Sequence, residues 1–126
     1  MNSFEELGVP QNLIEKLSAQ GISHPTIIQH KAIPEALEGR DILGLAQTGT
    51  GKTAAFVIPL LARVLKIGGK REAKSAQSLI LAPTRELAKQ IDSTVKTFVE
   101  GSHLRVRLVV GGVSISEKLK RRQQQV

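Results

Sequence analysis

The spacing of apolar residues changes several times along the chain, and each spacing predicts one kind of element. Apolar side chains recur every three or four residues, as in amphipathic helices, in four segments: 10–21, 26–37, 52–66 and 83–98. Three shorter apolar runs have the length of buried strands: 41–46, 78–82 and 105–110. Helices that join parallel strands cross over the sheet, so this order predicts an α/β fold with a parallel sheet flanked by helices.

Residues that favour helix ends support these boundaries. Pro10 suits the first position of a helix. Thr26 and Gln29 have the spacing of a capping box, in which each side chain bonds the backbone amide of the other residue. Pro34 predicts a kink in the second helix, and Ser114 predicts the start of a further helix near the end of the chain.

Composition excludes several classes of protein. The 126 residues contain no cysteine, which removes disulfide frameworks, thiolate metal sites and thiol nucleophiles. The apolar runs are too short to span a membrane, and the first ten residues lack the basic flank and apolar core of a signal peptide. We therefore expect one soluble globular domain in the cytoplasm, without a membrane partner.

Charge divides the chain into unequal halves. Residues 1–62 carry four basic and six acidic side chains, a net charge of −2. Residues 63–126 carry 14 basic and five acidic side chains, a net charge of +9. Such a basic half is typical of proteins that bind a polyanion such as nucleic acid, and a solvated basic surface is the alternative.

The strongest chemical signal is AQTGTGKT, residues 46–53, which follows a predicted strand and opens a predicted helix. A phosphate-binding loop needs backbone amides turned inward, and Gly49 and Gly51 permit the required backbone angles. Lys52 can reach the β- and γ-phosphates of a nucleotide, and the Thr53 hydroxyl can bind Mg²⁺. The loop usually begins with glycine, and Ala46 departs from that pattern. The alternative is a glycine turn with an incidental lysine.

At this point the sequence resembles the DEAD-box ATP-dependent RNA helicases. Phe4 lies 17 residues before GISHPTIIQ, residues 21–29, which is similar to the Q motif of that family. Residues 46–53 resemble its phosphate loop, PTRELA (residues 83–88) resembles its motif Ia, and Gly111-Gly112 resembles its GG element. The resemblance implies a P-loop NTPase with a RecA-like sheet, ATP and Mg²⁺ as cofactors, and RNA as partner.

The resemblance assigns a nucleotide site to ten residues. The Gln29 amide would read adenine, since it both donates and accepts, and Phe4 would stack on the base. Lys52 and Thr53 would also be catalytic. The full set of nucleotide-binding residues is Phe4, Gln29, Ala46, Gln47, Thr48, Gly49, Thr50, Gly51, Lys52 and Thr53. The residues allow plainer alternatives: a capping box for Gln29, and a core position for Phe4.

The resemblance also implies an RNA site. Thr84 and Arg85 would bind phosphate at the start of a helix, and Gly111 and Gly112 would let an RNA backbone approach closely. Such contacts predict binding that is largely independent of RNA sequence and sensitive to salt. The alternative is a simple helix cap followed by a surface arginine.

Parts of the family pattern are missing from this sequence. Its two aspartates, Asp41 and Asp92, do not end an apolar strand, and there is no D-E-A-D motif to hold Mg²⁺ during hydrolysis. We therefore expect a Q-motif helical region (residues 1–40) and an incomplete RecA-like ATP-binding domain (residues 41–126). These would form one truncated domain of a two-domain helicase, inactive alone. Alternatives are another P-loop NTPase, such as a GTPase or small kinase, and a non-catalytic RNA-binding module.

Overall fold

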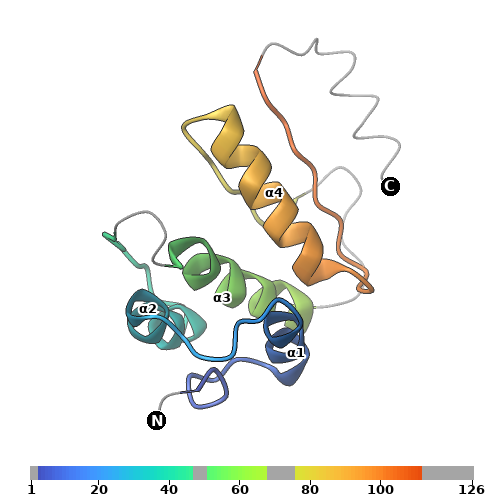
Figure 1. Ribbon diagram of the computed structural model, residues 1–126. Helices are drawn as coiled ribbons and strands as arrows, with labels where there is room; N and C mark the ends of the chain where they lie inside the picture. Colours follow the sequence, from blue (N-terminus) through green and yellow to red (C-terminus); the bar gives the residue numbers. More distant parts are fainter. Residues whose placement is uncertain (1–2, 47–50, 68–75, 112–126) are drawn as a thin grey trace. The chain divides into compact units, whose positions relative to one another are not determined.

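The computed structural model describes residues 3–46, 51–67 and 76–111. It contains the four predicted helices within these ranges: α1 (Gln11–Ala19), α2 (Ile27–Leu37), α3 (Lys52–Ile67) and α4 (Arg85–Val99) (Figure 1). The chain divides into two compact units, Met1–Gly68 and Gly69–Val126. Helices α1 to α3 belong to the first unit, and α4 belongs to the second.

The first unit is built around the apolar faces of its three helices. Helix α1 buries Leu13 and Leu17, which recur four residues apart, and Pro10 is its N-cap residue rather than its first helical residue. Helix α2 continues through Pro34 to Leu37, and it packs against α3. Helix α3 is buried on most sides, as its composition predicts, although Phe56 is 39% exposed. Burying a leucine side chain contributes about 1.5–3 kcal/mol, so these faces supply much of the stability of this unit.

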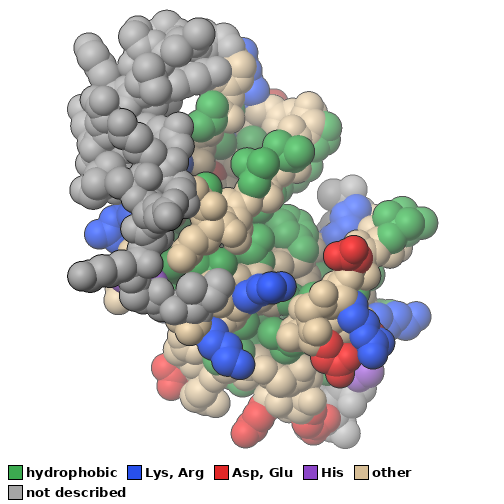
Figure 2. Space-filling view, turned by 180° about the vertical axis from the view of Figure 1, so that it is seen from behind, with side chains coloured by type: hydrophobic (Ala, Val, Ile, Leu, Met, Phe, Trp, Pro, Cys, Tyr) green, Lys and Arg blue, Asp and Glu red, His purple; other side chains and the backbone are tan. Residues whose placement is uncertain are grey.

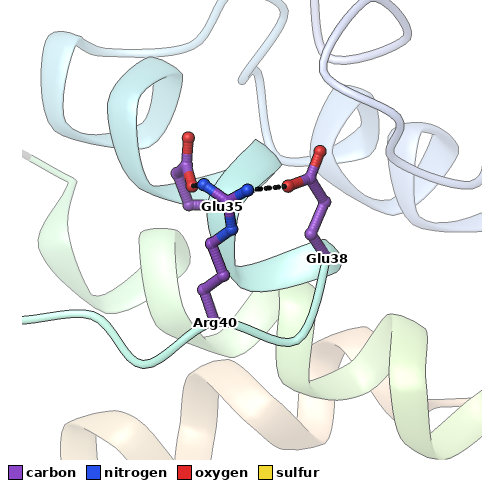
Figure 3. Close-up of polar contacts among 3 residues, drawn as sticks. All are labelled: Glu35, Glu38 and Arg40. Carbon is purple, nitrogen blue, oxygen red and sulfur yellow. Dashed lines mark hydrogen bonds and ion pairs between the residues drawn. The ribbon is translucent and has the colours of Figure 1, made fainter.

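Helix α2 ends in a turn that directs the chain toward residues 41–46. The amide of Gly39 donates to the carbonyl of Ala36, and the amide of Arg40 donates to the carbonyl of Glu35. This is a Schellman motif, which requires the positive φ of 88° found at Gly39. The Arg40 side chain also pairs with Glu35 at 2.6 Å and with Glu38 at 3.4 Å (Figure 3). Because these side chains are about half exposed or more, the ion pairs contribute little to stability.

The described part of the second unit is organised by α4. Its buried residues Ile91, Val95, Phe98 and Val99 recur three or four positions apart, so one side of the helix is covered. Thr84 is the N-cap residue, and its hydroxyl accepts a hydrogen bond from the Leu87 amide at 3.1 Å. On the same helix Asp92 pairs with Lys96 at 2.8 Å.

The predicted parallel sheet is not shown. In residues 3–46, 51–67 and 76–111 no strand is formed, including the three segments for which strands were expected. Four leucines of these segments are 79–87% exposed: Leu43, Leu45, Leu79 and Leu81. Figure 2 shows hydrophobic side chains at the surface of the described residues. A strand needs a partner for its backbone N–H and C=O groups, so an apolar run does not form one by itself.

Two other predictions concern a further helix near the end of the chain and the lack of a membrane-spanning segment. The helix expected from Ser114 lies outside the described residues. Among the helices that the structure does describe, none is both long and apolar enough to cross a membrane.

Candidate nucleotide-binding site

Gly51 marks the point where the phosphate-loop sequence enters α3. Its φ is +83°, a left-handed conformation that side chains with a Cβ rarely adopt. Its carbonyl accepts the first turn's hydrogen bond from the Ala55 amide at 3.1 Å. Among the loop residues 46–53, the structure describes Ala46, Gly51, Lys52 and Thr53, and the expectations for residues 47–50 lie outside it.

Gln29 connects this point to α2. Its side-chain Oε1 accepts a hydrogen bond from the backbone N–H of Thr26 at 2.9 Å. The backbone N–H of Gln29 donates to the Thr26 hydroxyl at 3.4 Å, so the capping box is confirmed. Its Nε2 also donates to the Gly51 carbonyl at 3.0 Å, across 22 positions of sequence. Gln29 is 3% exposed and is the one buried polar residue in the described part of the chain. Each hydrogen bond contributes about 1 kcal/mol, and more is lost when a buried partner is left unpaired.

The approach of Gln29 to Gly51 leaves no room for a side chain. A Cβ at position 51 would lie 2.4 Å from Nε2 of Gln29 and 3.0 Å from Oγ1 of Thr26. The sequence predicted glycine here for backbone freedom alone. The structure adds a second reason, the packing of the Gln29 amide, which no local pattern in the sequence indicated.

Lys52 joins the two described ends of the loop. Its Nζ donates to the Ala46 carbonyl at 3.0 Å, and the side chain is exposed. Half-buried Thr53 follows it in the first turn of α3, and that turn has no acidic residue. The Lys52 ammonium and the positive N-terminal end of α3 therefore lie close together, and the first turn of α3 has no carboxylate. This charge distribution favours the binding of an anion.

Phe4 has a different environment from the one expected of a base-stacking residue. Its side chain is 2% exposed and belongs to the core of the first unit. The structure thus agrees with the alternative interpretation of Phe4 as a core residue. Stacking on adenine would require the ring to be uncovered.

The predicted RNA-binding residues lie in the second unit. The Thr84 hydroxyl caps α4, as the simpler alternative predicted, but a hydroxyl that accepts one hydrogen bond can still donate another. Arg85 and Gly111 are both exposed. Gly112 lies outside the described residues.

A preformed metal-binding cluster is absent from residues 3–46, 51–67 and 76–111. No group of three or more histidine, cysteine, aspartate or glutamate residues is placed to hold an ion there. Asp92 is engaged with Lys96 on α4, and Asp41 is exposed. The Thr53 hydroxyl therefore remains the predicted protein ligand for Mg²⁺.

Known proteins share both the sequence and the fold of this chain. Residues 26–126 match the DEAD/DEAH box helicase family. The chain belongs to this family. It is 45% identical over 118 residues to the ATP-dependent RNA helicase DBP10 of Yarrowia lipolytica. Two solved structures are also similar. The RNA-helicase Prp28 from Chaetomium thermophilum, bound to ADP, matches with 42% identity and a TM-score of 0.81, and a DEAD box protein from Methanococcus jannaschii matches with 32% identity and a TM-score of 0.78.

These relatives are much longer than the match. Each alignment covers 94% of this chain, but only 12% of DBP10, 29% of the Prp28 chain and 31% of the Methanococcus jannaschii chain. Family membership and fold similarity therefore apply to this chain. The activity of a whole helicase is a separate question.

Proposed function

We propose that this chain supplies the ATP-binding part of an ATP-dependent RNA helicase. In the intact protein, ATP binding and hydrolysis would be coupled to the local unwinding of RNA duplexes. The observation that carries the proposal is the junction at α3, where a left-handed glycine, a lysine that spans the loop and a helix N-terminus meet. Membership of the helicase family supports it.

Residues 46–53 would bind the nucleotide through its phosphates. Backbone amides and the N-terminus of α3 attract the negative charge, and Lys52 exchanges its bond with the Ala46 carbonyl for the β- and γ-phosphates. The donor set fits Mg²⁺, since this ion accepts a single protein hydroxyl such as Thr53 when phosphate oxygens and waters complete its shell. Mg²⁺ would supply charge neutralisation at the phosphates.

Gln29 would select adenine among the bases. The amide is 3% exposed, so contact with a base requires local opening around the start of α2. Phe4 would join the base only after a larger rearrangement, because it is buried in the core. The proposal for Gln29 is therefore the stronger of the two.

Hydrolysis needs groups that this sequence lacks. An acidic residue at the end of an apolar strand is needed to hold Mg²⁺, and neither Asp41 nor Asp92 has that position. We propose that a complete RecA-like parallel sheet and a second RecA-like domain supply the missing groups. The chain alone would then bind ATP without hydrolysing it.

RNA would bind to the second unit through its sugar–phosphate backbone. The exposed Arg85, the capping Thr84 and Gly111 lie in a half of the chain with a net charge of +9, and Gly112 would extend the site. The Thr84 hydroxyl and the N-terminus of α4 suit a phosphate oxygen. Such binding would be sensitive to salt and largely independent of sequence.

The replacement Lys52→Ala tests nucleotide binding. Because it removes the cation at the N-terminus of α3, the affinity for an ATP analogue with Mg²⁺ should fall at least about tenfold, or about 1.4 kcal/mol, in titration calorimetry. Lys66→Ala is the matched control, since Lys66 lies in the last turn of the same helix and should leave the affinity unchanged.

Other outcomes would favour the alternatives. If Lys52→Ala leaves nucleotide affinity unchanged, the chain is better described as a non-catalytic RNA-binding module. If the unmodified chain binds GTP as tightly as ATP, another kind of P-loop NTPase is favoured.

A further inference from the structure

A groove lies at the C-terminal end of α4, the end opposite to Arg85. The chain turns after Val99, where the Ser102 amide donates to the Val99 carbonyl at 2.9 Å, and it then runs back beside the last turns of α4 (Figure 1). The space between these two segments has a volume of about 320 Å³. Because this volume is at the lower end of the range for ligand pockets, the groove suits a few side chains rather than a large molecule.

The groove has an apolar floor and a charged rim. Val99 is 7% exposed, and Leu104 and Val106 are half-buried. Three exposed charged side chains surround this floor: Lys96, Glu100 and Arg105. The floor offers burial to an aliphatic side chain, and a rim with two cations and one anion favours acidic groups beside it.

Both cations of the rim keep donors for a ligand. Lys96 pairs at 2.8 Å with Asp92, whose side chain is 12% exposed, so the ammonium is held in place and still has further N–H donors. Nη1 of Arg105 donates to the Leu104 carbonyl at 3.2 Å. A guanidinium has five N–H donors, so Arg105 can also bind a carboxylate through two of them.

The end of α4 itself does not oppose an acidic ligand strongly. Oγ of Ser102 donates to the Val99 carbonyl at 2.6 Å and accepts from the Leu104 amide at 3.2 Å. The Val99 carbonyl therefore has two donors, the Ser102 amide and the Ser102 hydroxyl. These bonds offset the negative charge of the helix C-terminus at this point.

A peptide fits this groove better than RNA does. None of the described residues that line it is aromatic, whereas single-stranded nucleic acid is usually bound through stacking of its bases on aromatic rings. The groove is also separate from the predicted RNA-binding residues. Arg85 and Lys96 are about three turns apart on α4, or about 16 Å along its axis.

We propose that this groove is the docking site of a protein partner, which presents an extended peptide with an aliphatic side chain beside acidic ones. The aliphatic side chain packs against Val99, Leu104 and Val106, and the carboxylates pair with Lys96 and Arg105. Docking here does not depend on the binding of ATP, and a partner and RNA can occupy the two ends of α4 at once.

Charge reversal at the rim tests the docking site. The probe is a fluorescein-labelled peptide of alternating leucine and glutamate, and its affinity for the chain is measured by fluorescence anisotropy at physiological ionic strength. Arg105→Glu should weaken binding about tenfold, since the new carboxylate would repel those of the peptide. Lys89→Glu is the matched control, because it makes the same change of charge at an exposed position of α4 outside the groove. It should leave the affinity within about twofold, since salt screens a distant exposed charge.

A second peptide tests the floor of the groove. Serine in place of every leucine keeps the charge of the probe and removes its aliphatic side chains. Its affinity should be at least about tenfold lower, because the burial of a leucine is lost. Equal affinities of the two peptides would overturn the proposal. Equal losses for Arg105→Glu and Lys89→Glu, or no binding of the leucine peptide to the unmodified chain, would overturn it as well.

A measurement on the unmodified chain covers the case in which Arg105→Glu does not fold. In nuclear magnetic resonance, the leucine peptide should shift the amide signals of Val99, Leu104 and Val106 and leave that of Arg85 in place. Oligouridylate added afterwards should not reverse these shifts. If it displaces the peptide from the groove, or if the peptide shifts Arg85 instead, the groove is not a peptide site and the proposal is wrong.

Discussion

Helices α2 and α4 begin in nearly the same way and differ in what lies three residues further on. Thr26 and Thr84 are both N-cap residues, and each hydroxyl accepts a hydrogen bond from the amide three positions later. In α4 the third residue is Leu87, and the cap is a local device. In α2 the third residue is Gln29, whose side chain bonds back to the cap and forward to Gly51, at the start of α3.

The difference shows how a local signal acquires a second role. The Thr84 cap satisfies an amide that an isolated helix would also leave open. The box in α2 instead orients a buried amide that holds the end of the phosphate-loop sequence against α2. Damage to the cap of α4 should remain local, whereas damage around Gln29 should reach both α2 and α3 and, with them, the proposed nucleotide site.

The largest expected effect comes from Gly51→Ala. The new Cβ would overlap Nε2 of Gln29, at 2.4 Å. The alanine backbone would also have to adopt the φ of +83° found at Gly51. We expect a loss in the free energy of unfolding of about 3 kcal/mol, measured by urea denaturation, from a left-handed alanine and an overpacked contact together. Affinity for an ATP analogue should fall as well, because the loop is displaced.

Gly39→Ala is the matched control for this variant. Gly39 has nearly the same φ, +88°, but no atom outside its immediate chain neighbours lies within 4 Å of the place that a Cβ would take. Only the backbone strain should remain, which costs about 1–2 kcal/mol. Equal losses for the two variants would show that the contact between Gly51 and Gln29 adds nothing.

The two caps can be compared directly with Thr84→Ala and Thr26→Ala. Loss of a threonine cap costs about 1 kcal/mol. We expect this cost in α4, where the bond is 3.1 Å, and a smaller one in α2, where the bond is 3.4 Å and the Thr26 N–H still holds Gln29. Hydrogen exchange of the Leu87 and Gln29 amides measures each cap. The comparison would be contradicted if Thr26→Ala speeds exchange of the Gln29 amide more than Thr84→Ala speeds exchange of the Leu87 amide.

The smallest expected effect is on RNA affinity, with Arg85→Ala. Loss of one phosphate contact should weaken binding several-fold for every RNA sequence, and it should reduce the slope of log affinity against log salt by about 0.7. Lys89→Ala, an exposed residue one turn further along α4, is the control and should have less effect. A loss confined to one RNA sequence would count against binding through the backbone.

Local patterns predicted the four helices correctly, whereas the three predicted strands are not formed in the described residues. The helices α1 to α4 and the box between Thr26 and Gln29 were predicted, because the bonds that define them join residues at most four positions apart. The bond from Gln29 to Gly51 was not, since it spans 22 positions and no periodicity relates its ends. The burial of Phe4 was foreseen only as an alternative, because an aromatic residue suits both a core and a base.

The sequence by itself determined where the helices lie, and it predicted which residues would bind phosphate. A helix satisfies its hydrogen bonds within its own segment, and Lys52 keeps its charge in any fold. Tertiary structure alone decided that the Gln29 amide faces Gly51, and it also decides whether an apolar run such as 41–46 becomes a strand. Both outcomes depend on partners far away in the chain, which no local pattern specifies.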